Sequence, residues 1–190
     1  TVFNNYGTFR KSGGASEFAN ASVFGSGVFF NQLAGVIDVQ NGTNGLQLAF
    51  QGGANLNGGY ITTNQFGLTV LSYGNCNVNG TVTGTNTWEN NGNLVGATVI
   101  NGALTWVGGN WNGAPQVTLT PGSTLNIVGG IDHDMPNCVF TNNGTVAWSG
   151  GRIRGGGGGT TVYNYGLWDS QWDLVFNNDY GGSGTGFNNY

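Results

Sequence analysis

Charged side chains are scarce in this sequence of 190 residues. Only 6% of the residues are Asp, Glu, Lys or Arg, whereas about 25% is usual for a soluble domain. With 4 Lys plus Arg and a net charge of −4, the chain offers no basic patch for nucleic acid or for an anionic membrane. No apolar run approaches the roughly 18–20 residues of a membrane-spanning helix. We therefore expect no nucleic-acid partner and no membrane insertion of this segment.

Proline and cysteine are also rare. With 3 Pro, and with glycines that follow no triplet period, the chain is not collagen. The 2 cysteines, Cys76 and Cys138, lie almost three of the repeats described below apart. In coils stacked about 4.8 Å apart they would be separated by roughly 14 Å, which is too far for a disulfide. We expect two buried thiols.

Glycine and aromatic residues are abundant instead. The chain has 38 Gly, and 13% of its residues are aromatic, which argues against disorder because disordered chains are rich in charge and poor in aromatics. Asn, Thr, Ser and Gln take the place of charged residues at the surface. This composition is typical of a β-rich exported protein, and we predict a secreted, extracellular or cell-surface location.

A glycine followed by a short apolar alternation recurs along the chain at nearly constant spacing. The period is roughly 22 residues, which is in the range of solenoid repeats. Short alternating segments predict strands, and the Gly and Asn clusters between them predict turns. The glycines of this series are Gly35, Gly58, Gly80, Gly102, Gly122, Gly144 and Gly166.

The regular period decides between two all-β architectures. Antiparallel hairpins in a sandwich or propeller do not require the same sequence once per turn. Stacked coils do, because each coil pairs with equivalent residues above and below it. We predict an all-β, right-handed, single-stranded parallel β-helix of about eight coils with roughly 22 residues each. One such repeat domain covers residues 1–190.

The asparagines support stacked coils. Residues 3–7, 88–92, 140–144 and 163–166 each place an aromatic residue ahead of Asn and then Gly. Asn and Gly tolerate the left-handed backbone of sharp turns. Inward aromatic rings would stack from coil to coil, and Asn side chains in register would form a hydrogen-bonded ladder along the axis.

Segments 102–109 and 143–151 resemble the repeats of large secreted bacterial β-helix proteins, the pectin-lyase-like and the autotransporter or adhesin-type passenger solenoids. The resemblance covers nearly the whole chain and implies a right-handed β-helix exposed at a cell surface, but no catalytic residue. The chain begins and ends within a repeat and shows no cap. We expect a segment of a longer array, or a unit that stacks on neighbouring repeats or self-associates end to end.

One dense polar cluster stands out, formed by Asp132, His133, Asp134, Arg152 and Arg154. The regular period predicts that Asp132 and Arg154 occupy equivalent positions of adjacent coils. Carboxylates beside arginine and histidine can perform acid/base chemistry on a polysaccharide, as in a lyase or a glycoside hydrolase. The alternative is an Asp–Arg pair that bridges two coils.

We predict no metal site and no cofactor. Consecutive residues of a strand point to opposite faces, so residues 132–134 are poorly placed to share an ion. The glycine run 155–159 lacks the aspartates of calcium-binding β-rolls. A bound calcium ion is the one cofactor left open.

Six tryptophans crowd mostly into the second half of the chain. The alternation places Trp106 on the same side as Leu104, and Trp148 on the same side as Val146, so we expect these two indoles inside. Other tryptophans lie in turn-like sequence, where indoles beside carboxylates could stack on sugar rings. The candidate carbohydrate-binding residues are Trp111, Trp168, Asp169, Trp172 and Asp173.

The favoured hypothesis is a non-enzymatic extracellular or cell-surface β-helical module with a structural or adhesive role. The scarcity of titratable groups motivates it, since active sites usually gather several such groups on one face. The alternatives are a carbohydrate-binding module that uses surface tryptophans, and a polysaccharide lyase or hydrolase. Whether the protein is an enzyme stays open. Expected partners are a polysaccharide, or a cell-surface or matrix component.

Overall fold

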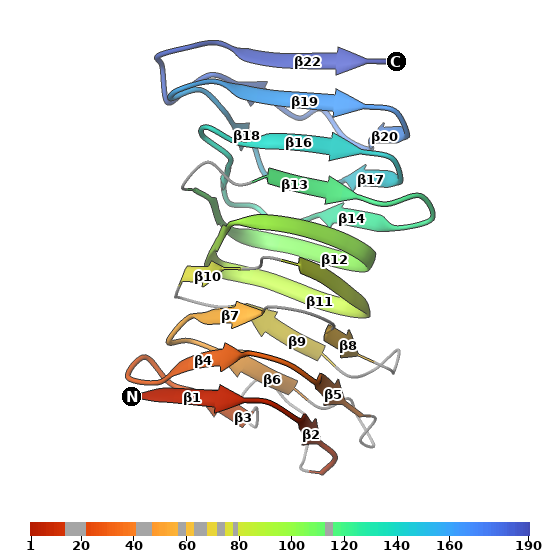
Figure 1. The fold of residues 1–190 in the computed structure, drawn as a ribbon. Helices are drawn as coiled ribbons and strands as arrows, with labels where there is room; N and C mark the ends of the chain where they lie inside the picture. Colours follow the sequence, from red (N-terminus) through yellow and green to blue (C-terminus); the bar gives the residue numbers. More distant parts are fainter. Residues whose placement is uncertain are drawn as a thin grey trace.

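The computed structural model describes residues 1–13, 22–40, 47–56, 60–62, 68–71, 75–77, 80–112 and 116–190, with backbone alone for residue 47 and for those of these residues that lie between 56 and 91. This part of the chain is built from strands that stack as rungs along one axis, with the two termini at opposite ends (Figure 1). Every pairing between described strands is parallel. The described residues include no helix that is long and apolar enough to cross a membrane. The chain is therefore an all-β parallel solenoid, as predicted.

The strands form three faces, here called faces 1, 2 and 3 in the order in which each turn of the chain visits them. The strands β11 (Gly80–Val95) and β12 (Ala97–Trp111) are long enough to run through all three. Face 1 otherwise contains β1 (Val2–Asn5), β4 (Phe29–Gln32), β7 (Ala54–Leu56), β10 (Asn75–Asn77), β15 (His133–Asp134), β18 (Ile153–Arg154) and β21 (Phe176–Asn177).

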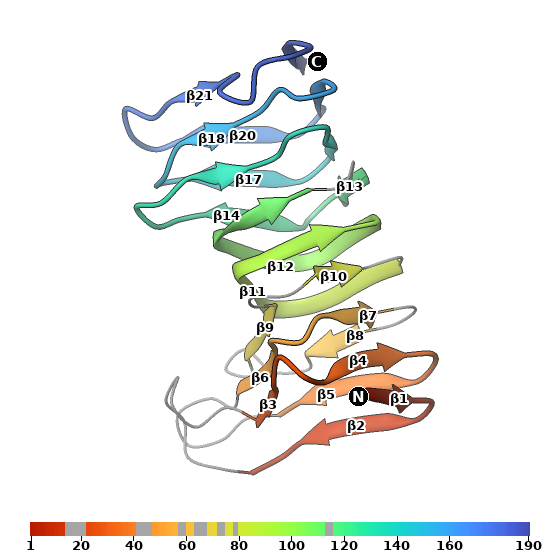
Figure 2. The ribbon, with the colours of Figure 1, turned by 90° about the vertical axis from the view of Figure 1, so that its left-hand side faces the viewer.

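The other two faces continue each turn (Figure 2). Face 2 contains β2 (Thr8–Lys11), β5 (Val36–Val39), β8 (Tyr60–Thr62), β13 (Gln116–Leu119), β16 (Val139–Asn142), β19 (Thr160–Asn164) and β22 (Thr185–Asn189). Face 3 contains β3 (Ser22–Phe24), β6 (Gln47–Phe50), β9 (Leu68–Leu71), β14 (Thr124–Ile127), β17 (Thr145–Trp148) and β20 (Leu167–Ser170).

The coils differ in length more than the sequence period suggests. The pairing of residues in adjacent coils shows how long one turn of the chain is. In a long coil one turn leads from Val2 to its partner Phe29, whereas in a short coil it leads from Gly80 to its partner Thr98. Between β16 and β19 it leads from Val139 to Thr161. The short central coils have a structural consequence. Gly35 and Gly80 begin strand segments of face 2, whereas Gly102 leads into a segment of face 3. The glycines of the repeat series therefore lie at different corners in different parts of the solenoid. The right-handed sense and the number of about eight coils stay predictions.

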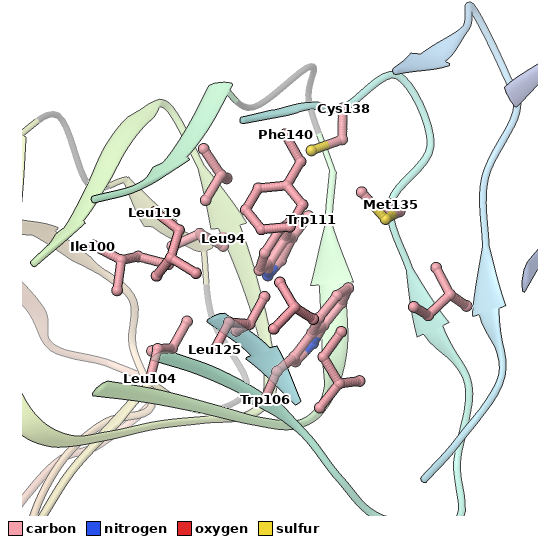
Figure 3. Packing of buried hydrophobic residues seen from close by; sticks show 14 of the residues in the cluster. Leu94, Ile100, Leu104, Trp106, Trp111, Leu119, Leu125, Met135, Cys138 and Phe140 are labelled. Atoms are coloured by element: carbon pink, nitrogen blue, oxygen red, sulfur yellow. The ribbon is translucent and has the colours of Figure 1, made fainter. Parts of the chain in front are cut away.

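Alternation along each strand separates the interior from the surface. In β14 and β17 every second residue is buried, as the period of two requires. Trp106 and Trp148 are 0% and 5% exposed, which confirms that both indoles point inward. The rings of Trp106 and Trp111 stack across the interior with centroids 4.3 Å apart, and Phe140 packs edge-on against Trp111 (Figure 3). Cys138 lies in the same core, and the side chain of Cys76 is outside the described residues.

The expected asparagine ladders are present at two places. On face 1, the Asn31 amide donates to Asn4 over 2.9 Å, and that of Asn55 donates to Asn31 over 3.5 Å. Between faces 2 and 3 a second ladder passes through the buried Asn142 and Asn164 to the exposed Asn189, with two hydrogen bonds of 2.6 Å. In-register side chains of one type therefore connect successive coils along the axis.

Glycine is needed at the corners mainly because the coils approach closely there. A Cβ added to Gly166 would lie 2.1 Å from the carbonyl oxygen of Gly144, and one added to Gly35 would lie 2.1 Å from that of Gly7. Gly144 and Gly166 do not have the positive φ expected for their motifs, whereas Gly35 has φ of 81°. At Gly144 and Gly166 the missing side chain matters for space, not for backbone freedom.

Candidate functional site

The polar cluster lies where β15 and β18 pair on face 1. His133 is in register with Ile153, and Asp134 is in register with Arg154. Alternation turns His133 and Ile153 into the core, and places Asp134 and Arg154 on the outer side of the strands. The expected register between Asp132 and Arg154 is wrong, because this coil is shorter than the mean repeat and brings Asp134 opposite Arg154.

The aspartates and arginines meet as two pairs between the coils. The guanidinium of Arg152 donates to both carboxylate oxygens of Asp132, over 3.0 and 2.9 Å. Arg154 does the same to Asp134, over 2.6 and 2.8 Å. A further contact of 3.2 Å joins Arg154 Nη1 to Asp132 Oδ2, so the two pairs form one network. Bidentate pairing of this kind fixes geometry as well as charge.

Two residues of the next coil complete this network. Asp179 Oδ2 lies 2.8 Å from Arg152 Nη1, and the Tyr180 hydroxyl donates to Asp134 Oδ2 over 2.7 Å. The guanidinium of Arg154 also lies over the Tyr180 ring, 5.4 Å from its centroid, where a cation–π attraction operates. We refer to Asp132, Asp134, Arg152, Arg154, Asp179 and Tyr180 together as the arginine network.

The surroundings of Asp132 and Tyr180 in the arginine network shift the pKa of both residues. The hydrogen bonds from Arg152 lower the pKa of Asp132, and partial desolvation only partly opposes this effect. Burial and the hydrogen bond to Asp134 raise the pKa of Tyr180, which keeps its proton on the phenol. A general acid needs the opposite environment, because a carboxyl group must hold its proton near neutral pH to deliver it. Asp132 is therefore held as a carboxylate in an ion pair between coils and is not placed to act as a general acid.

His133 is separated from the arginine network by its own strand. The imidazole is 0% exposed, packs edge-on against Trp106 at 4.8 Å, and neither ring nitrogen makes a hydrogen bond of ordinary geometry. Burial lowers its pKa, and the nearby backbone of Val128 and Gly150 opposes this only in part. A neutral imidazole in the core does not reach a polysaccharide outside, so the structure does not combine His133 with the four charged residues into one site.

No metal centre is visible in the described part of the chain. Among these residues, no three or more His, Cys, Asp or Glu side chains are grouped so that they could hold an ion. The glycine run 155–159 instead makes a tight corner, in which Gly157 and Gly158 donate to the Gly181 carbonyl and to Asn137 Oδ1. The calcium alternative thus gains no support from the described residues.

The tryptophans do not form the expected surface platform. Trp111 is 0% exposed, so the prediction that it lies at the surface is wrong: β12 continues as far as Trp111, and its side chain faces inward. Trp168 is half-buried and packs edge-on against Phe187 at 4.9 Å. Trp172 is 72% exposed and lies outside the core. Of the two predicted carboxylates, Asp169 accepts a hydrogen bond from Gln171 and Asp173 is exposed.

A second in-register pair repeats the pattern of the arginine network near the N-terminus. Arg10 on β2 is in register with Asp38 on β5, and its Nε donates to Asp38 Oδ2 over 2.8 Å. All three arginines of the chain thus contact an aspartate of the adjacent coil. Sequence reasoning missed Asp38, Asp179 and Tyr180 because they belong to coils longer than the mean repeat.

No family model, curated protein or solved structure matches this chain. The class that the fold defines is the parallel β-solenoid, and the arguments about function rest on the arrangement of the residues themselves.

Proposed function

We propose that this chain is a non-enzymatic structural or adhesive solenoid module of an extracellular or cell-surface protein. The observation that carries the proposal is the set of contacts that the arginine side chains make. Each Arg forms an ion pair with an Asp of the adjacent coil, and the densest polar cluster is therefore an inter-coil connection. A parallel solenoid with such connections is suited to serve as a rigid spacer or as an extended surface.

The composition supports the extracellular part of the proposal. A chain with 6% charged residues, in which amides, hydroxyls and glycine take their place, is typical of a β-rich exported protein. The in-register parallel stacking of strands supports a solenoid, which is the architecture that the resemblance to pectin-lyase-like and adhesin-type proteins implies. Partners of this module would be a polysaccharide, a matrix component or further solenoid repeats.

The proposal is tested by offering the folded chain insoluble cellulose, chitin, xylan and pectin, and measuring protein retention and reducing-end release in the same tubes. We expect no release from the wild type or from Asp134→Asn. Release by the wild type that Asp134→Asn abolishes, with an unchanged melting temperature, would overturn the proposal. In that case the arginine network would be a catalytic site.

A second candidate function rests on Trp172. Its indole is 72% exposed, in the turn between β20 and β21, and the carboxylates of Asp169 and Asp173 are close in sequence. An exposed indole can stack on the apolar face of a sugar ring, which is the basis of a carbohydrate-binding module. This hypothesis predicts that Trp172→Ala abolishes retention on one of the four polysaccharides, whereas Tyr6→Ala, also at an exposed aromatic residue, leaves it unchanged. Equal retention of Trp172→Ala and wild type would exclude this role.

A further inference from the structure

Two exposed tyrosines lie face to face on neighbouring coils. Tyr165 follows β19 and Tyr190 follows β22, and these strands pair in register up to Asn164 and Asn189. Their rings are stacked with centroids 4.6 Å apart and an angle of 13° between the planes. Tyr165 is 54% exposed and Tyr190 is 69% exposed, so both phenols are accessible from outside.

The backbone beneath this pair is firmly held. The Tyr190 amide donates to the carbonyl of Asn164 over 2.9 Å, and the Asn164 side chain donates to Asn189 over 2.6 Å. Gly166, directly after Tyr165, sits against Gly144 with no room for a side chain. The two tyrosines therefore stay on adjacent rungs, which are about 4.8 Å apart in a parallel sheet.

The chemistry of the pair follows from this proximity. Partial desolvation and the neighbouring hydroxyls of Tyr190 and Tyr163 raise the pKa of Tyr165, which therefore stays protonated at neutral pH. Loss of one electron and one proton converts a phenol to a phenoxyl radical. Two such radicals held together combine far faster than radicals that must meet by diffusion.

We propose that Tyr165 and Tyr190 are a site of oxidative cross-linking, at which a one-electron oxidant, such as a peroxidase acting with hydrogen peroxide, joins the two rings as dityrosine. Each phenol gives up one electron and one proton. The radicals form a carbon–carbon bond between ring positions ortho to the hydroxyls, and the two ring hydrogens then return to the oxygens as the rings regain aromaticity. Hydrogen peroxide takes up the two electrons and two protons and becomes two waters. The inference does not depend on the proposed structural role.

Other exposed tyrosines lack this arrangement. Tyr6 is 70% exposed, and no ring contact joins it to another tyrosine among the described residues. Tyr180 donates its hydroxyl to Asp134 and lies under Arg154. Among the tyrosines whose side chains the structure describes, this is the one stacked pair, and a cross-link there would join two coils covalently at their outer corner.

The experiment treats the folded chain with peroxidase and hydrogen peroxide, and then cleaves it on the amino side of aspartate. This cleavage separates peptide 134–168, which contains Tyr165, from peptide 179–190, which contains Tyr190. We expect dityrosine fluorescence and a joined peptide pair that has lost two hydrogens. The pair should disappear in Tyr165→Phe and in Tyr190→Phe, which remove only a hydroxyl and keep the ring.

Two control variants test the assignment within the same peptides. Tyr163→Phe and Tyr180→Phe should still yield the joined pair, and circular dichroism should show that all four variants are folded. The inference is wrong if the joined pair survives in Tyr165→Phe or Tyr190→Phe. It is equally wrong if the wild-type tyrosines are oxidised without forming the pair.

Discussion

The first and the last coils of this solenoid share one architecture but differ in coil length and in the side chains that fill the core. Near the N-terminus the coils are long, with Val2 opposite Phe29, and the buried aromatic rings are those of phenylalanine, with the centroids of Phe30 and Phe50 4.8 Å apart. Beyond residue 116 the coils are shorter, and tryptophan shares the core with phenylalanine. Both regions nevertheless have an asparagine ladder, corner glycines and an in-register Arg–Asp pair.

The comparison of the two regions separates the features that every parallel coil requires from those that can vary. The lengths of the described coils differ between the two regions. Inward rings, corner glycines and stacked polar pairs recur because each coil must match its neighbours at those positions. Stability should therefore depend on the contacts between neighbouring coils, and matched substitutions in the two regions can test that.

The largest effects are expected from the core. Phe30 and Phe140 are 0% and 1% exposed, one in each region. Phe30→Ala and Phe140→Ala should each lower the free energy of unfolding by about 3–5 kcal/mol, because both leave a cavity that the strands cannot close. Chemical denaturation measures these values. A cost below about 1 kcal/mol at either site would show that the region around it is not tightly packed.

Substitutions of the corner glycines should have the next largest effect on stability. Gly166→Ala places a Cβ against the Gly144 carbonyl and should cost about 1–3 kcal/mol through overpacking. Gly35→Ala meets the same obstacle and also has φ of 81°, which adds roughly 1–2 kcal/mol. Gly7→Ala is the control, since nothing lies within 4 Å of its Cβ position. Equal melting temperatures for Gly7→Ala and Gly35→Ala would refute the account of the corners.

The two asparagine ladders should contribute unequally to the free energy of unfolding. Asn164 is buried, and Asn164→Ala leaves the Asn142 amide and the Asn189 carbonyl without their bonds of 2.6 Å, at a cost of about 1–3 kcal/mol. Asn31 belongs to the more exposed ladder, where water replaces the lost bond, so Asn31→Ala should change stability by less than about 0.5 kcal/mol. Thermal unfolding of both variants tests the order, and a larger loss for Asn31→Ala would reverse it.

A pH dependence should distinguish the C-terminal region, because His133 is the only histidine in the chain. Burial lowers its pKa in the folded state below the ordinary value of 6.5. The unfolded chain then binds more protons below that pH, so the free energy of unfolding should fall by up to about 1.4 kcal/mol per unit as the pH drops from about 6.5 towards 5. His133→Phe should remove this slope. A slope that persists in His133→Phe would assign the effect to another group.

Much of this architecture could be predicted from the sequence, because parallel stacking demands repetition. The alternation around Trp106 and Trp148 indicates their inward position, and the Asn-Gly motifs indicate the ladders. Repetition is also where the prediction fails. A mean period conceals coils of unequal length, so the sequence predicts the wrong register for Arg154, which lies opposite Asp134 and not opposite Asp132.

The tryptophan prediction fails for a related reason. Gly108, Gly109 and Asn110 look like a turn, so the sequence places Trp111 at the surface. In the structure β12 runs through this segment, with Asn110 in register with Asn93 and Trp111 in register with Leu94. Which way a side chain faces at a corner depends on the path of the backbone, and a short glycine-rich segment does not encode it.

A double-mutant cycle on Asp134 and Arg154 tests most directly the claim that the arginine network holds coils together. The free energy of unfolding is measured for the wild type, Asp134→Asn, Arg154→Gln and the double variant. Because the pair is bidentate and Asp134 is nearly buried, we predict a coupling energy of about 1–2 kcal/mol. Costs that add within about 0.3–0.5 kcal/mol would contradict the account, since the pair would then contribute nothing to the contact between coils.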